Sequence, residues 1–147
     1  MSTLTIPAEL VALVRSALFT ELGSAAEETA HVVEQHDHED HTERFTEPLL
    51  RHNAARALLD AIRWQGAEHP ADVQVDLHTH HTALTAALDV ALLVGDEELA
   101  EAERVDAERA QRGEPSKRDT TTRRVLALRE FAAAVQAQAD QLREGRR

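Results

Sequence analysis

Apolar residues recur every three or four positions along most of the chain, which is the pattern of amphipathic α-helices. The pattern predicts five helices, over about residues 7–35, 46–65, 70–94, 96–112 and 116–144. The last predicted helix has the most regular apolar stripe, formed by Val125, Leu128, Ala132, Val135, Ala139 and Leu142. This stripe covers under three heptads, so it predicts a helix packed in a bundle and not a free-standing coiled coil.

Three other predicted helices carry stripes that we expect to face the core, because residues at these spacings lie on one side of a helix. In helix 7–35 the stripe is Val11, Val14, Leu18, Leu22, Ala25, Thr29 and Val32. In helix 46–65 it is Leu50, Ala54, Ala57, Ala61 and Trp64, widened by Leu58 and Ile62. In helix 70–94 it is Val73, Leu77, Leu84, Leu88 and Ala91.

Capping residues and prolines mark several predicted helix ends. Thr46 precedes Pro48 by two residues and is the expected N-cap of the second helix. Gly113 ends the fourth helix, and Ser116 and Asp119 have the spacing of a capping box at the start of the fifth.

Two glycines raise questions about helix continuity. Gly95 followed by Asp96 predicts a stop and a new N-cap. The segment 96–112 has a poor apolar stripe, however, so it is either an edge helix or the continuation of a long helix 70–94. Gly23 falls inside a predicted helix, where glycine costs about 1 kcal/mol relative to alanine.

The predicted fold is all-α, an antiparallel (up-down) bundle of four to five helices in a single domain over residues 1–147. The segment VQVDL (73–77) alternates like a β-strand, but the sequence shows no partner strand, so we assign it to the third helix. The Ala-rich core contains few large anchors. A lean core is often supplemented by self-association, so we expect a homo-oligomer, most simply a dimer, or a complex with another protein.

Charge is unevenly distributed, although the net charge is −11. Residues 1–40 carry −7, 41–95 carry −3, 96–114 carry −5, and 115–147 carry +4. We expect the basic C-terminal helix to balance the acidic first or fourth helix, within the chain or across a dimer. The alternative is that its arginines bind nucleic acid or another acidic partner; they are Arg123, Arg124, Arg129, Arg143, Arg146 and Arg147.

Composition excludes several function classes. The sequence has no Cys, so disulfides, thiolate metal sites and Cys nucleophiles are excluded. A strongly acidic chain disfavours partners with phosphate backbones, and no apolar stretch approaches the roughly 20 residues of a membrane span. We therefore expect a cytoplasmic protein without nucleic-acid or membrane partners. The use of arginine in place of lysine, together with abundant alanine, suggests a GC-rich bacterial genome.

Histidine is the only residue type whose distribution suggests chemistry. Nine His residues include two clusters, HDHEDH (36–41) and DLHTHH (76–81). Imidazole and carboxylate suit a divalent transition metal such as Zn, and a loop could bring together His36, His38 and His41. We favour a hydrophilic loop that caps the first helix, and in the second cluster partly buried, hydrogen-bonded residues with His78 pointing away from the apolar stripe.

No catalytic motif is present in the sequence. Of the two Glu-x-x-His pairs that a ferritin-like di-iron site requires, the sequence offers one, Glu28 with His31. The sequence therefore favours a non-enzymatic protein that needs no cofactor. We expect it to act by association, with itself or with a partner. A metal-binding bundle using the loop 36–41 is the main alternative, and small-molecule binding inside the bundle remains open.

Overall fold

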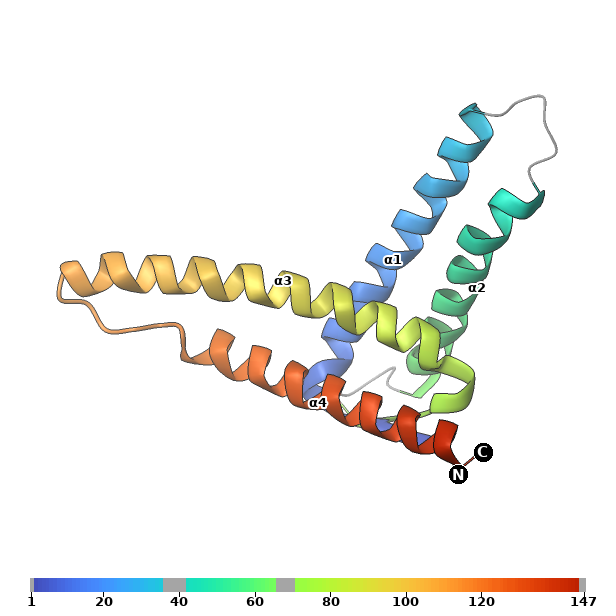
Figure 1. Ribbon diagram of the computed structural model, residues 1–147. Helices are drawn as coiled ribbons and strands as arrows, with labels where there is room; N and C mark the ends of the chain where they lie inside the picture. Colours follow the sequence, from blue (N-terminus) through green and yellow to red (C-terminus); the bar gives the residue numbers. More distant parts are fainter. Residues whose placement is uncertain (1, 36–41, 66–70, 146–147) are drawn as a thin grey trace.

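The computed structural model describes residues 2–35, 42–65 and 71–145. In chain order these residues form β1 (Thr3–Ile6), α1 (Ala8–Gln35), α2 (Thr42–Gln65), β2 (Val73–Asp76), α3 (Leu77–Gln111) and α4 (Asp119–Glu144). Successive helices run antiparallel, α1 with α2 and α3 with α4 (Figure 1). The fold is the predicted all-α, antiparallel bundle, to which a small two-stranded sheet is added.

The helices form two hairpins that meet at a common base and point in different directions. In Figure 1 the α1–α2 hairpin rises to the upper right and the α3–α4 hairpin extends to the left. The hairpins are joined through α3, which packs against both α1 and α2. The core lies at this junction and contains Ile6, Leu10, Val14, Leu18, Leu58, Ile62, Val73, Leu77, Leu84 and Leu128.

The expectation of a helix over 73–77 is wrong for Val73–Asp76, because these residues pair with the first residues of the chain, and the helix starts at Leu77. Strands β1 and β2 are antiparallel, with Leu4 opposite Val75 and Ile6 opposite Val73. These four apolar side chains are buried, while the alternate positions are exposed. The alternation was visible in the sequence, but its partner lies about 70 residues away in the chain, where no local pattern identifies it.

Helix α3 runs unbroken from Leu77 to Gln111, so the predicted stop at Gly95 is wrong and the continuous helix is correct. Gly95 is buried against α4, where a Cβ would lie 3.2 Å from Cγ2 of Val125. The glycine therefore permits close packing of two helices and does not end one. Asp96 is not an N-cap but forms an ion pair with Arg129 at 2.9 Å.

Helix α2 starts earlier than expected and buries a face shifted from the expected stripe, although Leu58 and Ile62 are buried as predicted. It begins at Thr42, so Thr46 lies inside the helix, and the ring of Pro48 is buried. Leu50 is 63% exposed and Ala57 is exposed, whereas Ala55, Leu58 and Ile62 are buried. Both sides of this helix carry apolar residues, so the sequence alone left the buried side underdetermined.

Asp106 of α3 organises the connection to α4, a role that the sequence analysis had not assigned. Its carboxylate accepts hydrogen bonds from the hydroxyl of Ser116 and from the backbone N–H of Lys117 at 3.0 Å. Both hydrogen bonds lower the pKa of Asp106, and the bond from the Ser116 hydroxyl is the largest cause. Ser116 thus does not form the predicted capping box. Helix α4 starts at Asp119, and the side chain of its N-cap residue, Arg118, makes no capping hydrogen bond.

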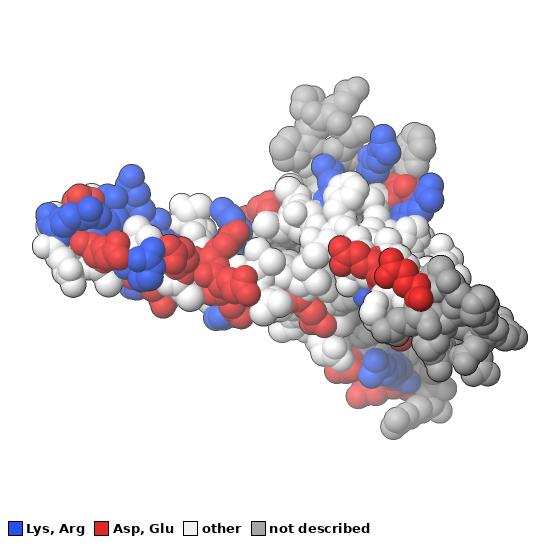
Figure 2. All heavy atoms as spheres, turned by 90° about the horizontal axis from the view of Figure 1, so that it is seen from above, with Lys and Arg blue, Asp and Glu red and all other residues white. Residues whose placement is uncertain are grey.

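The basic residues of α4 pair with the acidic part of α3, as one of the expected arrangements requires. Arg124 lies 3.4 Å from Glu98, and Arg118 lies 3.7 Å from Asp106. Figure 2 shows basic and acidic residues side by side along this projecting arm, while the middle of the molecule is largely uncharged in this view. In the described part of the chain, no helix is long and apolar enough to cross a membrane.

Candidate association surface

The predicted metal ligands His36, His38 and His41 lie outside the described residues. Among the residues that the structure does describe, no three His, Asp or Glu side chains are grouped so that they could hold a metal ion. His31 is exposed on α1, and the carboxylate of Glu28 accepts a hydrogen bond from Arg51. Of the Glu-x-x-His pair, Glu28 is therefore engaged in a contact between α1 and α2, whereas His31 lies exposed on the same helix.

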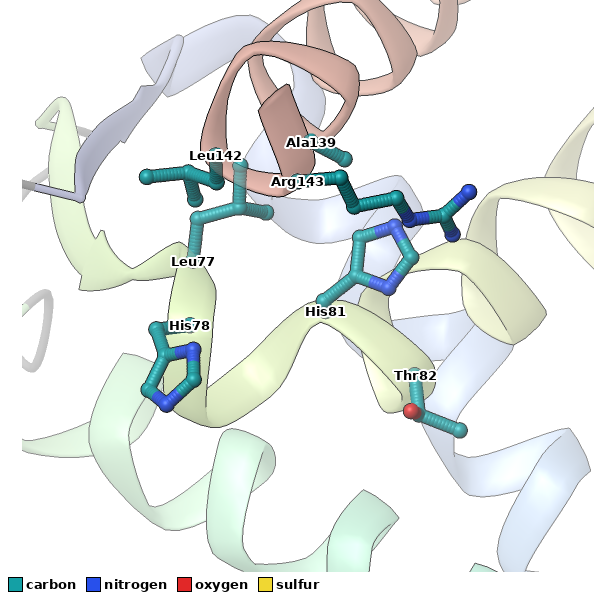
Figure 3. Close-up of a pocket in the computed structure, with 7 residues that line it drawn as sticks. All are labelled: Leu77, His78, His81, Thr82, Ala139, Leu142 and Arg143. Atoms are coloured by element: carbon teal, nitrogen blue, oxygen red, sulfur yellow. The ribbon is translucent and has the colours of Figure 1, made fainter. Parts of the chain in front are cut away.

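The second histidine cluster lines a shallow pocket between the start of α3 and the end of α4. The pocket measures about 240 Å³. In Figure 3, His81 and Arg143 point toward one another from the two helices, whereas His78 points away. His80 and His81 are partly buried, as expected, and Nε2 of His81 lies 3.4 Å from the hydroxyl of Thr85.

The described lining of this pocket combines imidazole, hydroxyl and guanidinium groups with apolar walls. None of its described lining residues is acidic, and its walls are formed by Leu77, Ala139 and Leu142. The guanidinium of Arg143 is largely exposed and lies 3.9 Å from Asp140 on its own helix. The one charged group in the pocket is therefore an exposed guanidinium that already has a carboxylate nearby, which makes it a weak anchor for a ligand.

A larger pocket of about 500 Å³ lies on the projecting arm between α3 and α4. It is lined by Glu97, Glu101, Val105, Lys117 and Arg118, among others. Its lining carries four carboxylates, with Glu98 and Asp106 included, against two cations, but three of the four carboxylates are already paired with arginines.

A partly buried ion pair holds α1 to α2. Nε of Arg51 donates a hydrogen bond of 2.9 Å to Glu21, the one charged residue that is buried among those the structure describes. The hydrogen bond from Arg51 to Glu21 is the largest cause of the raised pKa of Arg51. Arg51 also contacts Glu28, so one guanidinium bridges two turns of α1. This cluster is structural, because it fixes the rotation of α1 and leaves the opposite side of the helix free.

That opposite side of α1 is an uninterrupted uncharged surface, which we name the outer face of α1. Its residues are spaced four and three apart in strict alternation, and all are exposed: Ala12, Ser16, Phe19, Gly23, Ala26 and Ala30. Phe19 is 59% exposed. Arg15 and Glu27 border the face on its two edges.

Within the part of the chain that the structure describes, no contact requires a glycine at position 23. A Cβ placed there would meet no atom within 4 Å, and its backbone dihedral is not in the left-handed region. Glycine in a helix interior costs about 1 kcal/mol relative to alanine. Gly95 incurs the same cost, but there Val125 occupies the space that a side chain would take.

The outer face continues into a groove beside α3 that is partly apolar and also contains the charged side chains of Glu98 and Arg124. A pocket of about 130 Å³ is bounded on the α1 side by Leu13, Ser16 and Thr20 and on the α3 side by Val90 and Val94. Val94 is 46% exposed. A helix placed on the outer face would therefore also reach an apolar edge of the other hairpin.

Leu93 and Leu126 do not form comparable surfaces, and the exposed Leu49 and Leu50 of α2 lie between Glu47 and Arg51 in the sequence. Leu93 on α3 has Asp89 and Glu97 one turn away on each side, and Leu126 on α4 has Glu130 one turn away. Single exposed hydrophobic residues between charges are common on protein surfaces.

The outer face of α1 was not among the surfaces predicted from the sequence. The signal was present, because the six positions repeat with the spacing of a coiled-coil seam and one of them is an interior glycine. It was hidden because small residues weigh little in a hydrophobic pattern, and the stripe of Val and Leu on the buried side dominates the same helix. Comparisons with protein-family models, with curated proteins and with solved structures find no match.

Proposed function

We propose that this protein acts without catalysis, as a helical module that associates with a second copy of itself or with another protein through the outer face of α1. The observation that carries the proposal is the exposure of Phe19 in the middle of an uncharged helix face. The chain as a whole is 29% charged, so 19 residues of helix surface without a charge along its midline are unusual for it.

The energetics favour covering this face. Full burial of a Phe side chain stabilises a protein by about 1.5–3 kcal/mol, and well-packed aromatic anchors often dominate association energies. The small residues around Phe19 lose little side-chain entropy when they are covered, so most of the gain from its burial is retained.

The charge distribution also supports a protein partner over nucleic acid. Of the C-terminal arginines that could contact phosphates, Arg124 and Arg129 are each paired with a carboxylate of α3, and Arg143 lies 3.9 Å from Asp140. The cytoplasmic location expected from the composition belongs to the same proposal.

The proposal is tested by photo-crosslinking in cells that make the protein. A benzoylphenylalanine residue in place of Phe19 should give a crosslinked product of defined mass after irradiation, with the protein itself or with another protein. The matched control carries the same photoreactive residue in place of Leu126, which is 51% exposed but bordered by charge. Absence of any product specific to position 19 would contradict the proposal.

A further inference from the structure

We infer that the outer face of α1 binds the outer face of a second copy, with the two α1 helices antiparallel about a two-fold axis level with residue 21. The inference rests on the proposed association function and names its partner. Three features carry it: the symmetry of the face, the match of Phe19 to Gly23, and the open space at Gly23.

The spacing of the face reads the same from either end. Along α1 the steps between its six residues are four, three, four, three and four. An antiparallel helix of the same sequence therefore places every residue of the face opposite another, with Ala12 opposite Ala30 and Ser16 opposite Ala26 of the second copy. A closed two-fold interface of this kind uses the same patch on both copies, as the commonest dimers do.

In this register the largest residue of the face lies opposite the smallest. Phe19 of each copy faces Gly23 of the other, where the structure leaves open space. Shifting the register by seven residues would leave two of the six positions unpaired and place Phe19 against Ser16 or Ala30. A parallel pair would place Phe19 on Phe19 and Gly23 on Gly23, which crowds one layer and leaves a cavity in the next.

The size of the face indicates a reversible dimer. Residues 12–30 span about 27 Å of helix, and a helix is about 10 Å wide. This contact is smaller than the roughly 800 Å² per partner of a standard stable interface, even with the apolar edge at Val94 added. We therefore expect a dissociation constant in the range of about 1 to 100 μM.

Salt distinguishes a second copy from an oppositely charged partner. Two copies with a net charge of −11 each repel one another, while the face between them carries no charge. Raising the salt from about 0.02 M to about 0.5 M shortens the screening length several-fold. Self-association should therefore strengthen with salt, whereas binding to a basic partner would weaken.

The register is tested by disulfide formation in the full chain, which has no cysteine of its own. The double variant Ser16→Cys with Ala26→Cys should form a covalent dimer on mild oxidation. In the proposed register the thiol at position 16 of one copy faces the thiol at position 26 of the other. Neither single variant should do so, because the same residue in the two copies lies about 15 Å apart along the antiparallel pair. Efficient crosslinking of Ser16→Cys alone would overturn the antiparallel register.

The contact itself is tested by sedimentation velocity from about 1 to 200 μM protein. Gly23→Gln fills the open space without adding charge and should weaken dimerisation at least tenfold, while Ser24→Gln, on the neighbouring exposed position, should leave it unchanged. Circular dichroism should show both variants equally helical. A wild-type protein that stays monomeric at every concentration and salt would overturn self-pairing, and a position-19 crosslink to a different protein would then still support the association function.

Discussion

The backbone of Gly95 in α3 packs directly against the side chain of Val125 in α4, with 3.2 Å between Cγ2 of Val125 and the place that a Cβ would occupy. This contact lets the two helices of the second hairpin approach closely. It also explains why a residue that usually ends helices lies inside the longest one.

The two helical glycines should respond oppositely to alanine. Gly23→Ala should raise the free energy of unfolding by about 1 kcal/mol, because the new methyl group meets nothing. Gly95→Ala gains the same helix preference but pushes on the stiff side chain of Val125, so we expect a net loss of about 1 kcal/mol. Urea unfolding at about 1 μM protein, where the monomer dominates, measures both. Equal stabilities of the two variants would show that the contact with Val125 is not tight.

Breaking the ion pair between the α1 and α2 helices should be costly. Arg51→Ala leaves the carboxylate of Glu21 buried without its partner, and we expect a loss of about 1–3 kcal/mol in unfolding free energy, since both groups retain some solvent contact. Arg104→Ala removes exposed pairs with Glu101 and Glu108, which solvent screens, so it should change the unfolding free energy far less than Arg51→Ala.

A second substitution separates charge from packing at this site. Glu21→Gln in the Arg51→Ala background removes the unpaired charge, so it should recover part of the lost stability. A further loss in the double variant would mean that Arg51 acts mainly by packing.

Asp76 should make stability sensitive to acid. Hydrogen bonds from Ser2, the largest cause, and from Thr79 lower its pKa from 3.8 to about 2. A carboxylate with a lowered folded-state pKa contributes its full stabilisation above its unfolded value and loses it as the pH falls through the folded value. Its contribution should therefore disappear between about pH 4 and about pH 2.

Two variants isolate this contribution. Asp76→Asn can still cap α3 but cannot titrate, so its stability should fall less steeply over that pH range than that of the wild type. Ser2→Ala removes the largest cause of the shift and should give an intermediate slope. Thermal unfolding at a series of pH values gives the slopes, and identical curves for all three proteins would refute the role of Asp76.

The buried sides of α1 and α4 could be predicted from sequence because each helix has a single apolar stripe. The expected residues Val14, Leu18, Leu128 and Val135 are all buried. The sheet and the continuity of α3 could not be predicted in the same way. Both depend on contacts between segments distant in sequence, β1 with β2 and Gly95 with Val125.

The candidate association surface was also hidden from local sequence patterns, because it depends on contacts between separate helices. The histidine clusters attracted attention by composition, whereas the outer face of α1 becomes visible only when the structure shows which side of the helix is already occupied. Within the first hairpin, the ion pair of Arg51 with Glu21 fixes that side.

The metal hypothesis for the loop 36–41 makes a separate prediction. Our account expects that isothermal titration with Zn or Ni gives the same affinity for the wild type and for the triple variant His36→Ala, His38→Ala and His41→Ala. A matched triple variant at His78, His80 and His81 controls for nonspecific binding by exposed imidazoles. A stoichiometric site lost only in the first variant would favour the metal-binding bundle.

The proposed dimer, in which the outer face of α1 binds a second copy, can be detected by its mass. Native mass spectrometry of untagged protein, purified without chelator or a nickel column, tests it most directly when wild type, Phe19→Glu and Leu126→Glu are compared over a concentration series. We predict a dimer that grows with concentration in the wild type and in Leu126→Glu, and a monomer throughout in Phe19→Glu. The same mass distribution in all three proteins would contradict the account.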